Sequence, residues 1–450
     1  MAKNQIPEFL RDALTCPQCE GSYSSGGRCQ GCQKELEFVA GVAWAFENPD
    51  AEKTFWAIRS RAYLESLKTE AEVLSQQELR AAGLTRQRLQ ILRDAKVQGR
   101  KAWEEILLPF VQARTGQFPI EALRLPHPVS MNLLGYYSNF LRDWGWGDPE
   151  NAIAARLVRN ELGNSRNLLI LGGGSGRLGY DLHDELGSQL TLNMDLNPAL
   201  ILGSQALLEG RSFEIPEFPL QPANLSSTAV RVHLAPRKPK AGFVHVLADA
   251  TRPPVQPGFW HSVLTPWFLD ILPEHPSEVL PEISRSLALG GQWVYFGSVR
   301  FHYRQESENL SVEELIELAK AFGLELKSQK REEIPYMNSP HSAQSRREKV
   351  WIARFEKTKE VSHARMAKSW KPAWLEDTGV PVGLDPIWKS WASTHQIYAE
   401  VLGLIDGQRS LEQMGKLLAQ RYGAGQQEMT ASVTAFLRRL LEESRFQGLA

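Results

Sequence analysis

The amino-acid sequence predicts an α/β protein whose central part is a largely parallel sheet. Two observations carry this prediction. Short apolar runs alternate with helical segments between about residues 131 and 357, and the first of these runs ends in a glycine-rich loop. Alternation of this kind is typical of βαβ units, in which helices connect parallel strands. The expected strands are Asn167–Leu171, Leu190–Asp195, Phe243–Asp249, Ser262–Thr265 and Gln292–Phe296.

The composition is that of a folded protein with several hydrophobic cores. Of the 450 residues, 42% are hydrophobic and 23% are charged, and this length suggests about three domains. The 51 basic and 52 acidic residues nearly cancel, whereas nucleic-acid-binding proteins usually carry a basic excess. We therefore do not expect nucleic acid as a partner. No apolar run reaches the ~18 residues of a membrane span, and the N-terminal residues lack a secretory signal, so we expect no membrane partner and a cytoplasmic location.

All the cysteines lie in two C-x-x-C pairs near the N-terminus. Nine residues separate the pair Cys16 and Cys19 from the pair Cys29 and Cys32. Four thiolates complete a tetrahedral coordination sphere, which is typical of a structural zinc ion. The alternatives are four incidental thiols or a redox pair. Residues 1–48 resemble the zinc ribbon found ahead of some methyltransferases and in the activator subunit of certain tRNA and protein methyltransferases.

Two further segments are expected to lie outside the central sheet. Residues 49–130 carry apolar side chains three and four positions apart, which predicts a helical segment. One such stripe consists of Ala57, Tyr63, Leu64, Leu67 and Ala71. The stretch from about residue 209 to 240 is rich in proline and weakly periodic, so we expect an insertion or a lid rather than core.

A glycine-rich loop follows the first expected strand and opens a helical segment. Gly172, Gly174 and Gly176 let the backbone pass close to a ligand at the carboxyl end of the strand. The next strand ends about twenty residues later in Asp195, where a carboxylate is placed to accept hydrogen bonds from ribose hydroxyls. Asp249 closes the third strand and is expected to hold an adenine amino group. The alternative role of Asp249 is that of a helix N-cap.

Several pieces of the chain between Asn139 and Phe355 belong together as a set. They are Asn139–Trp144, Leu171–Gly179, Asn193–Asn197, Asp249, Phe259–Asp270, Gly290–Tyr303 and Leu310–Leu315. In this order they resemble the motifs of the carnosine N-methyltransferase family, which methylates a histidine imidazole nitrogen in a dipeptide. The resemblance implies a Rossmann-like methyltransferase core over residues 131–357 and S-adenosyl-L-methionine as the cofactor.

The resemblance also implies roles for individual residues. The matching cofactor-contacting positions are Asn139, Arg142, Gly172, Gly174, Gly176, Asp195, Asp249, Ala250 and Ser262. Asp270 and His302 match positions that hold the substrate, and we expect them to be catalytic. The family carries substrate-contacting tyrosines near its last strand, whereas this chain has Ser345–Arg347 there. The catalytic core is therefore expected to be shared more closely than the substrate.

The expected activity is N-methylation of a histidine-like imidazole in a small molecule or short peptide. An imidazole near its own pKa needs no strong base, so the protein mainly aligns the sulfur, the methyl group and the acceptor nitrogen. Asp270 would hydrogen-bond one ring nitrogen and stabilise the developing imidazolium. His302 would orient the substrate or take up a proton. The alternative interpretation makes Asp270 the cap of a helix near Pro273 and His302 an ordinary histidine after a strand.

Residues 358–450 are expected to form a linker and a small winged-helix domain. The stretch Leu402–Met414 contains a D-G-x-R core and is followed by two helical segments. These features resemble PqqD-like domains, which bind precursor leader peptides in peptide-modifying pathways. A leader peptide is thus a candidate partner, and the alternative is a helical tail packed on the enzyme. The competing functions are a leader-dependent peptide methyltransferase, an RNA methyltransferase and a non-catalytic scaffold.

Overall fold

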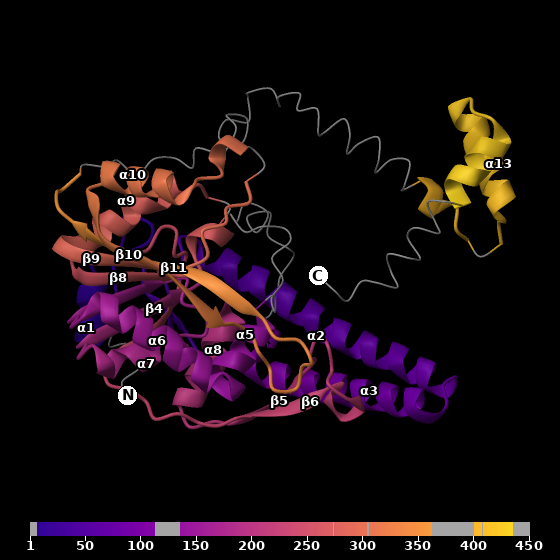
Figure 1. The fold of residues 1–450 in the computed structure, drawn as a ribbon, viewed down its shortest axis with the longest axis horizontal. Coiled ribbons are helices and arrows are strands. Elements are labelled where there is room, and N and C mark those ends of the chain that lie inside the picture. The colour runs from indigo at the N-terminus through magenta and orange to yellow at the C-terminus, as the bar shows by residue number, and fades with distance from the viewer. Residues whose placement is uncertain are drawn as a thin grey trace. The chain divides into compact units, whose positions relative to one another are not determined.

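The computed structural model describes residues 7–112, 136–272, 274–303, 306–361, 400–406 and 408–434. The chain divides into two compact units, Met1–Trp370 and Lys371–Ala450. The first unit is built around a broad sheet that carries helices on both faces (Figure 1).

Within the described residues, the main sheet has nine strands in the order β1-β2-β7-β4-β3-β8-β9-β11-β10. The strands are β1 (Glu37–Val39), β2 (Val42–Trp44), β3 (Asn167–Leu171), β4 (Leu190–Asp195), β7 (Phe243–Leu247), β8 (Trp260–Pro266), β9 (Leu287–Gly297), β10 (Leu324–Pro335) and β11 (Arg347–Lys357). All neighbours from β2 to β9 are parallel. Strand β11 runs antiparallel to both β9 and β10.

The five predicted strands are all present at the centre of this sheet. Their order, β7-β4-β3-β8-β9, is the 3-2-1-4-5 order of a doubly wound sheet. The direction in which strands are added reverses between β3 and β8, and ligands bind at such a switch point. The predicted α/β class is therefore confirmed, and the order fixes where a ligand site is to be sought.

The two faces of the sheet are covered by different helices. Successive residues of a strand point to opposite faces. Leu168 and Ile170 accordingly lie in a buried cluster with α6 (Asp148–Leu162) and α7 (Arg177–Glu185), whereas Leu169 and Leu171 lie in a cluster with α9 (Pro276–Ser286) and α10 (Val312–Ala321). Strand β3 is buried on both sides, which explains its unbroken apolar sequence.

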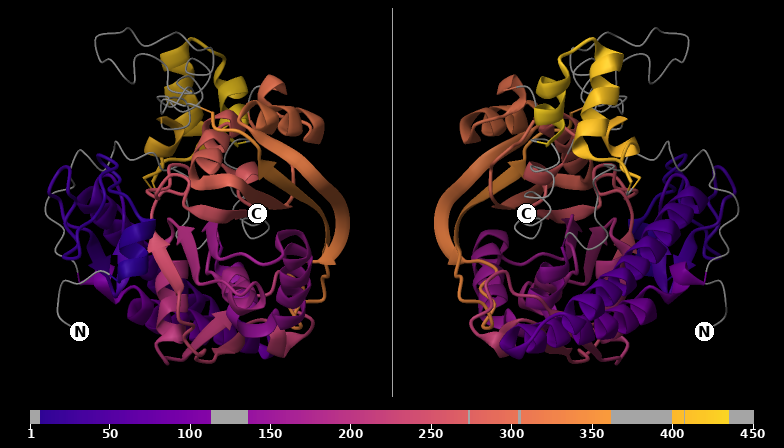
Figure 2. Two further views of the ribbon diagram at one scale, coloured as in Figure 1. Left: turned by 90° about the vertical axis from the view of Figure 1, so that its left-hand side faces the viewer. Right: turned by 90° about the vertical axis from the view of Figure 1, so that its right-hand side faces the viewer.

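The cysteine-containing segment is joined to the edge of the main sheet. It begins with α1 (Glu8–Ala13) and ends in the hairpin of β1 and β2. Strand β2 pairs parallel with β7 through Ala43 opposite Val246 and Trp44 opposite Leu247. Figure 2 shows this indigo segment beside the central strands. The segment thus extends the sheet of the first unit.

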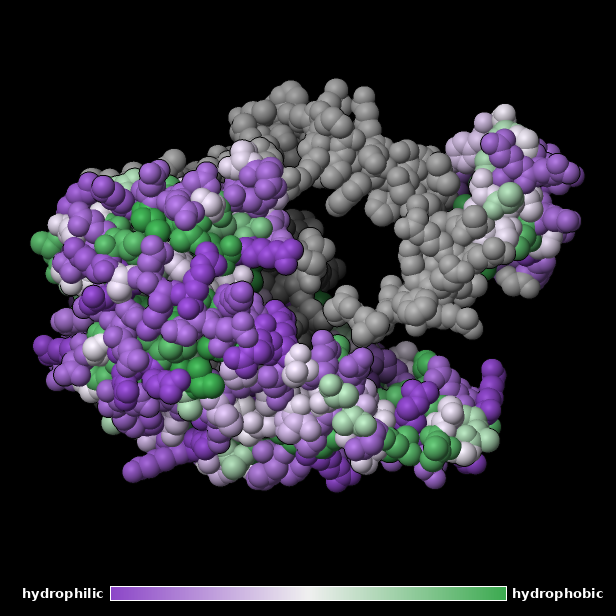
Figure 3. Space-filling model, viewed as in Figure 1, coloured by the Kyte–Doolittle hydropathy of each residue, from purple (hydrophilic) through white to green (hydrophobic). Residues whose placement is uncertain are grey.

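Residues 49–112 of the predicted helical segment form a long hairpin, and residues 113–130 of that segment lie outside the described residues. The helices of the hairpin are α2 (Pro49–Leu79), α3 (Gly83–Ile106) and α4 (Leu108–Val111). In the predicted stripe, Ala57, Leu64 and Leu67 lie in a buried cluster against which Tyr63 packs, and Ala71 is also buried. Figure 3 shows apolar residues at the far end of the hairpin, where Leu79 and Leu84 are exposed.

The proline-rich stretch after α8 (Pro198–Leu208) forms a separate two-stranded sheet of β5 (Phe213–Glu217) and β6 (Val230–Leu234). It lies outside the main sheet, as expected for an insertion. Its inward-facing side chains are nevertheless buried in the core: Phe213, Ile215, Val232 and Leu234. The expectation that this stretch is not core is therefore wrong for the two strands, because their two-residue alternation places one apolar face inward.

Short helical turns complete the first unit. They are α5 (Tyr137–Leu141), the π-helical turn η2 (Arg142–Trp146), and the 3₁₀ turns η3 (Leu225–Ser227), η4 (Leu269–Ile271) and η5 (Glu306–Glu308). Among the described helices of the chain, none combines the length and the apolar character that a membrane span requires.

The second unit contains α13 (Leu411–Tyr422), with further helical residues at 400–403 and 426–434. A capping box begins α13: Ser410 Oγ accepts from the Gln413 N–H at 3.3 Å, and Gln413 Oε1 accepts from the Ser410 N–H at 2.8 Å. A small core joins these helices and consists of Val401, Met414, Leu418 and Val433.

The D-G-x-R core of this unit has a structural explanation. Asp406 Oδ1 accepts a hydrogen bond from the Arg409 N–H at 2.9 Å, and the Arg409 guanidinium lies 3.1 Å from Asp406 Oδ2. The motif thus forms a closed turn directly before α13. Gly407, which we expect in the same turn, lies outside the described residues.

Candidate functional site

A cavity of about 310 Å³ lies at the carboxyl ends of the central strands. Its walls include Gly172–Ser175 after β3, Asp195–Asn197 at the end of β4, Asp249–Thr251 after β7 and Pro266–Phe268 at the end of β8. The cavity therefore occupies the switch point between β3 and β8, where doubly wound sheets bind their ligands.

Most of the predicted cofactor residues meet at this cavity. Those that line it are Asn139, Arg142, Gly172, Gly174, Asp195, Asp249 and Ala250. The residues of the described chain that line it do not include Gly176, Ser262, Asp270 or His302.

Gly172 and Gly174 give the loop after β3 a shape that other residues rarely adopt. Their φ angles are +66° and +56°, in the left-handed region that favours glycine. A Cβ atom on Gly172 would overlap the ring of Phe268, whereas a Cβ atom on Gly174 would have its nearest neighbour, Leu200 Cδ1, at 4.0 Å. Gly174 therefore faces open space, which a larger side chain would fill.

Gly176 allows the same loop to pack closely against the sheet. A Cβ atom on Gly176 would overlap the buried ring of His245. That ring lies 3.3 Å from Asn193 Nδ2 and 3.1 Å from Ser204 Oγ, and burial lowers the pKa of His245 to about 3. The ring is therefore neutral at neutral pH, and Gly176 lets the loop lie close to the sheet instead of lining the cavity.

Asp195 ends β4 and fixes the glycine loop. Its Oδ2 accepts a hydrogen bond from the Gly174 N–H at 2.8 Å, and its Oδ1 accepts one from the Asn197 N–H at 2.8 Å. Burial raises the pKa of Asp195 above its ordinary value, against these backbone hydrogen bonds. Each carboxylate oxygen has a second lone pair, so Asp195 can also accept hydrogen bonds from two adjacent hydroxyls of a ligand.

Asp249 is held by the loop that follows β7. Its Oδ1 accepts hydrogen bonds from the Thr251 N–H at 2.9 Å and the Thr251 hydroxyl at 2.6 Å. Residues 249–256 form no helix, so the alternative interpretation of Asp249 as a helix N-cap is wrong. The turn presents Asp249 and Ala250 together at the cavity wall.

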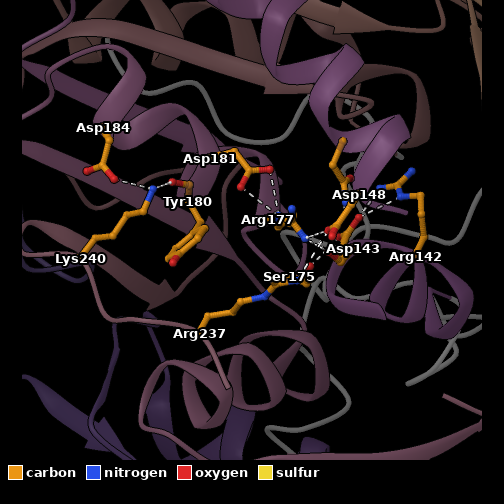
Figure 4. Close-up of polar contacts among 11 residues, drawn as sticks. Arg142, Asp143, Asp148, Ser175, Arg177, Tyr180, Asp181, Asp184, Arg237 and Lys240 are labelled. Carbon is orange, nitrogen blue, oxygen red and sulfur yellow. Dashed lines mark hydrogen bonds and ion pairs between the residues drawn. The ribbon is translucent and has the colours of Figure 1, made fainter. Parts of the chain in front are cut away.

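The π-helical turn η2 passes beside the cavity and is tied to the glycine loop (Figure 4). Arg142 donates from Nε and Nη2 to Asp143 Oδ1 at 2.9 and 2.6 Å. Ser175 Oγ donates to Asp143 Oδ2 at 2.6 Å. Asp143 therefore links η2 to the loop and neutralises Arg142 at the cavity wall. π-Helical turns are frequent at functional sites.

Arg177 extends this network at the start of α7 (Figure 4). It donates from Nε to Asp181 Oδ2 at 2.9 Å, and its Nη1 lies 2.9 Å from Asp148 Oδ1 and 2.5 Å from the Asp143 carbonyl oxygen. The buried guanidinium is thus fully compensated, and it fixes the first turns of α6 and α7 around the loop.

Aromatic side chains line the cavity near Asp270, which does not itself line it. Trp267 and Tyr336 line it, with ring centroids 5.4 Å apart. Asp270 lies in η4, next to the lining residue Ile271. Its Oδ1 atom is buried and has no hydrogen-bond partner among the described residues. Burial raises the pKa of Asp270 to about 6.

Ser262 and His302 are not brought to the cavity. Ser262 is near the amino end of β8, where its buried hydroxyl accepts from Ser165 Oγ at 2.8 Å. The cavity lies at the carboxyl end of β8, so a cofactor contact does not fit the position of Ser262. His302 is exposed in the loop after β9.

Helix α9 begins at Pro276 with His275 as its N-cap, so the alternative interpretation of Asp270 as a helix cap is also wrong.

Several lining residues were not assigned from the sequence. Three of them, Asp143, Ser175 and Trp267, lie inside the motifs described above. They could have been assigned because neighbouring residues of the same motifs were assigned to the site. Tyr136 and Tyr336 carry no such local signal. Tyr336 reaches the cavity only because β10 and β11 form a long hairpin, a long-range pairing that sequence pattern does not disclose.

The four predicted metal ligands also meet. The sulfur atoms of Cys16, Cys19, Cys29 and Cys32 all lie within 4.8 Å of one another. Thiolates at ~2.3 Å from one zinc ion in a tetrahedron would be about 3.8 Å apart. A Cβ atom on Gly21 would come within 2.9 Å of a cysteine sulfur, and one on Gly31 within 3.0 Å. The two glycines therefore leave the space that the sulfur atoms occupy. The residues fit a tetrahedral metal site.

Comparison with known proteins identifies a family in the second unit. Residues 384–444 match the family of coenzyme PQQ synthesis protein D (PqqD). This match agrees with the predicted PqqD-like domain and covers the described turn of Asp406 and Arg409. No curated protein sequence matches the chain at a significant level.

Several solved structures are similar to about half of the chain. The N-methyltransferase NodS from Bradyrhizobium japonicum WM9 is 15% identical, over 48% of this chain and 97% of that chain, with a TM-score of 0.32. A TehB-like SAM-dependent methyltransferase from Corynebacterium glutamicum is 18% identical, over 49% and 96%, with a TM-score of 0.31. Phosphoethanolamine N-methyltransferase 2 of Haemonchus contortus is 14% identical, over 45% and 44%, with a TM-score of 0.31.

Alignments of this quality are evidence for neither an activity nor a substrate. The strand order, with antiparallel β11 between β9 and β10, is the arrangement of a Rossmann-like methyltransferase core. The predicted fold class is confirmed by this order, together with the cysteine cluster and the PqqD match.

Proposed function

We propose that the chain is an S-adenosylmethionine-dependent methyltransferase. The observation that supports this most is the hydrogen bond from the Gly174 N–H to Asp195 at the switch point of the sheet. It brings a ribose-binding carboxylate and an open glycine loop to one cavity wall. The volume of about 310 Å³ falls at the lower end of the ~300–1,000 Å³ usual for ligand sites.

Each part of the cofactor has a place in the proposed complex. Asp195 accepts hydrogen bonds from the ribose hydroxyls, Asp249 and Ala250 hold the adenine, and the backbone at Gly172 and Gly174 lies against the methionine part. Asn139 and Arg142 border the same space. The cofactor supplies a methyl group activated by a sulfonium. The network around Asp143 keeps the loop in place before the cofactor arrives, which reduces the ordering cost of binding.

We infer further that the acceptor is a histidine-like imidazole in a small molecule or short peptide. Trp267 and Tyr336 supply aromatic rings to the cavity wall against which a planar ring can pack. The guanidinium carbons of Arg142 and Arg346 lie 5.6 and 5.0 Å from the Tyr336 ring centroid.

Asp270 adjoins the lining residue Ile271, and we propose that its unpartnered oxygen accepts a hydrogen bond from one ring N–H, which leaves the other nitrogen free as nucleophile. As that nitrogen took the methyl group and the carbon–sulfur bond of the cofactor broke, the ring would gain positive charge, which the Asp270 carboxylate would stabilise until the ring N–H lost its proton. His302, being exposed, orients only a part of the substrate outside the cavity.

The cysteine cluster is proposed to hold one structural zinc ion. Four thiolates close the coordination sphere, so the metal has no open position for chemistry. Cys16 and Cys29 are buried, and burial raises the pKa of Cys16 to about 12. A bound cation would overcome this shift by stabilising the thiolate.

A leader-dependent peptide methyltransferase is the second candidate function. The PqqD match over residues 384–444 favours it, because PqqD-like domains capture precursor peptides. In this version the second unit binds one part of a peptide and the cavity receives a histidine side chain of the same peptide. The chemistry at Asp270 is then unchanged, and only the size of the acceptor differs.

Mass spectrometry of reaction products tests the proposal. The purified chain is incubated with S-adenosylmethionine and a panel of free imidazoles, histidine dipeptides and longer histidine peptides. We expect acceptor-dependent formation of S-adenosylhomocysteine and of a singly methylated product, and an Asp195→Ala control without turnover. Turnover only on acceptors without an imidazole would overturn the acceptor assignment, and preferential use of a nicotinamide cofactor would overturn the reaction class.

A further inference from the structure

The loop of residues 249–256 connects the cavity with the cysteine-containing segment. Its first residues, Asp249, Ala250 and Thr251, line the cavity. Its last residues, Pro254, Val255 and Gln256, contact the segment that holds the four cysteines. The loop has no regular secondary structure, so its shape depends on what surrounds it.

Backbone hydrogen bonds tie the end of this loop to the chain just before the first cysteine. The Thr15 N–H donates to the Pro254 carbonyl oxygen at 2.9 Å, and the Gln256 N–H donates to the Ala13 carbonyl oxygen at 2.9 Å. Leu14 and Val255 form the antiparallel bridge between these bonds. Thr15 precedes Cys16, so the contact is one residue away from a metal ligand.

The packing is continuous from the cysteines to the cavity wall. Val255 and Leu14 are fully buried. They belong to one hydrophobic cluster with the buried cysteines Cys16 and Cys29, and the same cluster contains Ala250 at the cavity wall. A displacement of the cysteine segment would therefore remove packing from the residues that line the cavity.

A second connection runs along the edge of the sheet. The Ala45 N–H, just beyond β2, donates to the Leu247 carbonyl oxygen at 2.8 Å. Leu247 ends β7, two residues before Asp249. The opposite side of the loop is held by Arg285 of α9, which donates to the carbonyl oxygens of Val255 at 3.2 Å and Pro253 at 3.0 Å. The loop is thus fixed between α9 and the cysteine segment.

We propose that the metal-bound cysteine segment positions the 249–256 loop, so that metal occupancy sets the affinity of the cavity for the adenosine end of its ligand. Leu14, Thr15 and Val255 are the positioning residues. This inference rests on the proposed cofactor for its affinity readout, while the order of the loop can be measured without any ligand. A coupling of this kind typically changes affinity by about 5- to 150-fold.

Metal removal is the first test. The full chain, with its zinc content measured before and after chelation, is compared by calorimetry with S-adenosylhomocysteine and by amide hydrogen exchange without ligand. We expect zinc loss to weaken binding by about tenfold or more and to speed exchange at residues 249–256 more than at the loop of Gly172–Gly174. Unchanged affinity and unchanged exchange in zinc-free, folded protein would overturn the proposal.

A matched pair of substitutions keeps the test decisive if the zinc-free protein unfolds. Val255→Ala removes packing at the junction, whereas Val39→Ala removes the same atoms from β1, in the other hydrophobic cluster. Both alanine variants should lower thermal stability, but only Val255→Ala should weaken S-adenosylhomocysteine binding. The conservative variant Val255→Ile, which keeps an apolar side chain at the junction, should bind S-adenosylhomocysteine as the unmodified protein does. Equal effects of the two alanine variants on affinity would mean that the junction has no special role. Absence of binding by the unmodified protein would instead contradict the proposed function, while the exchange comparison would still decide the coupling.

Discussion

At the scale of single residues, Asp270 has the environment best suited to a direct role in the proposed reaction. It is removed from water enough that its pKa rises to about 6, and one of its oxygens has no partner among the described residues. A carboxylate left in this state is costly unless a ligand completes its hydrogen bonds. The same features that destabilise it therefore suit it to hold an N–H group that becomes more positive during the reaction.

We predict that Asp270→Asn lowers turnover about 30- to 1,000-fold, or ~2 to 4 kcal/mol of transition-state stabilisation. Affinity for S-adenosylhomocysteine should stay nearly unchanged, because Asp270 is not among the residues that line the cavity. Steady-state kinetics and calorimetry on the same preparation check both. Asp94→Asn, an exposed change on α3, is the control and should keep full activity. Full activity of the Asp270 variant would remove this residue from the mechanism.

The raised pKa of Asp270 also predicts a pH dependence. The folded carboxyl titrates at about 6, against ~3.9 in an unfolded chain. Since the folded state holds its proton longer, this group lowers stability as pH rises from ~4 to about 6, and the penalty persists above that. In the Asp270→Asn variant, the thermal unfolding temperature should therefore change less with pH between ~4 and about 6 than it does in the unmodified protein. Turnover, which needs the ionised form, should fall as pH drops through about 6 in the unmodified protein. An unaltered stability profile in the variant would contradict the shift.

Gly174 offers a separate test of the cofactor loop. Gly174→Val fills open space at the cavity wall and also strains a backbone with φ of +56°. Gly187→Val is a matched control, since Gly187 has a φ of +62° and open space around it but lies outside the cavity lining. Calorimetry should show a loss of S-adenosylhomocysteine affinity of at least ~100-fold, about 2.7 kcal/mol, in the Gly174 variant alone. Equal losses would assign the effect to backbone strain.

At the scale of elements, the fold was predictable where local pattern decides it. The central strands are buried on both faces, so their apolar runs stand out, and the glycines and Asp195 mark their carboxyl ends. The cysteine pairs were equally plain. The contributions of Tyr136 and Tyr336 were not predictable, because they depend on how distant segments pair. Ser262 was assigned from the motif alone, although it begins its expected strand and the ligands of such sheets lie at the carboxyl ends of the strands.

The cysteine segment leads to a prediction about metal content. Purified protein from zinc-replete medium should contain one zinc ion per chain, since the four sulfurs lie within 4.8 Å of one another. Cys29→Ser should lower this content, and Ser25→Ala, in the exposed loop between the pairs, should not. Elemental analysis checks the stoichiometry. Zinc-free unmodified protein, or unaltered content in the cysteine variant, would show that the thiols serve another purpose.

At the scale of the whole molecule, the chain consists of two compact units that suggest a division of labour. The first holds the cavity and the cysteine cluster, and the second contains the PqqD match. If the second unit captures peptides, then a chain ending at Trp370 should bind S-adenosylhomocysteine as the full chain does. Its KM for a captured peptide should rise by about tenfold or more, with no change for a free imidazole compound. An unchanged KM for every peptide acceptor would make the second unit irrelevant to substrate capture.

The proposed activity requires that the cavity at the switch point binds S-adenosylmethionine. Isothermal titration of the purified full chain with S-adenosylhomocysteine measures this directly, with NAD as the competing ligand class and Asp195→Ala as the variant that removes the proposed ribose contact. We expect saturable binding with one site per chain, no comparable binding of NAD, and strongly weakened binding by the variant. Absence of S-adenosylhomocysteine binding by the unmodified protein, or tighter binding of NAD, would contradict the proposed activity.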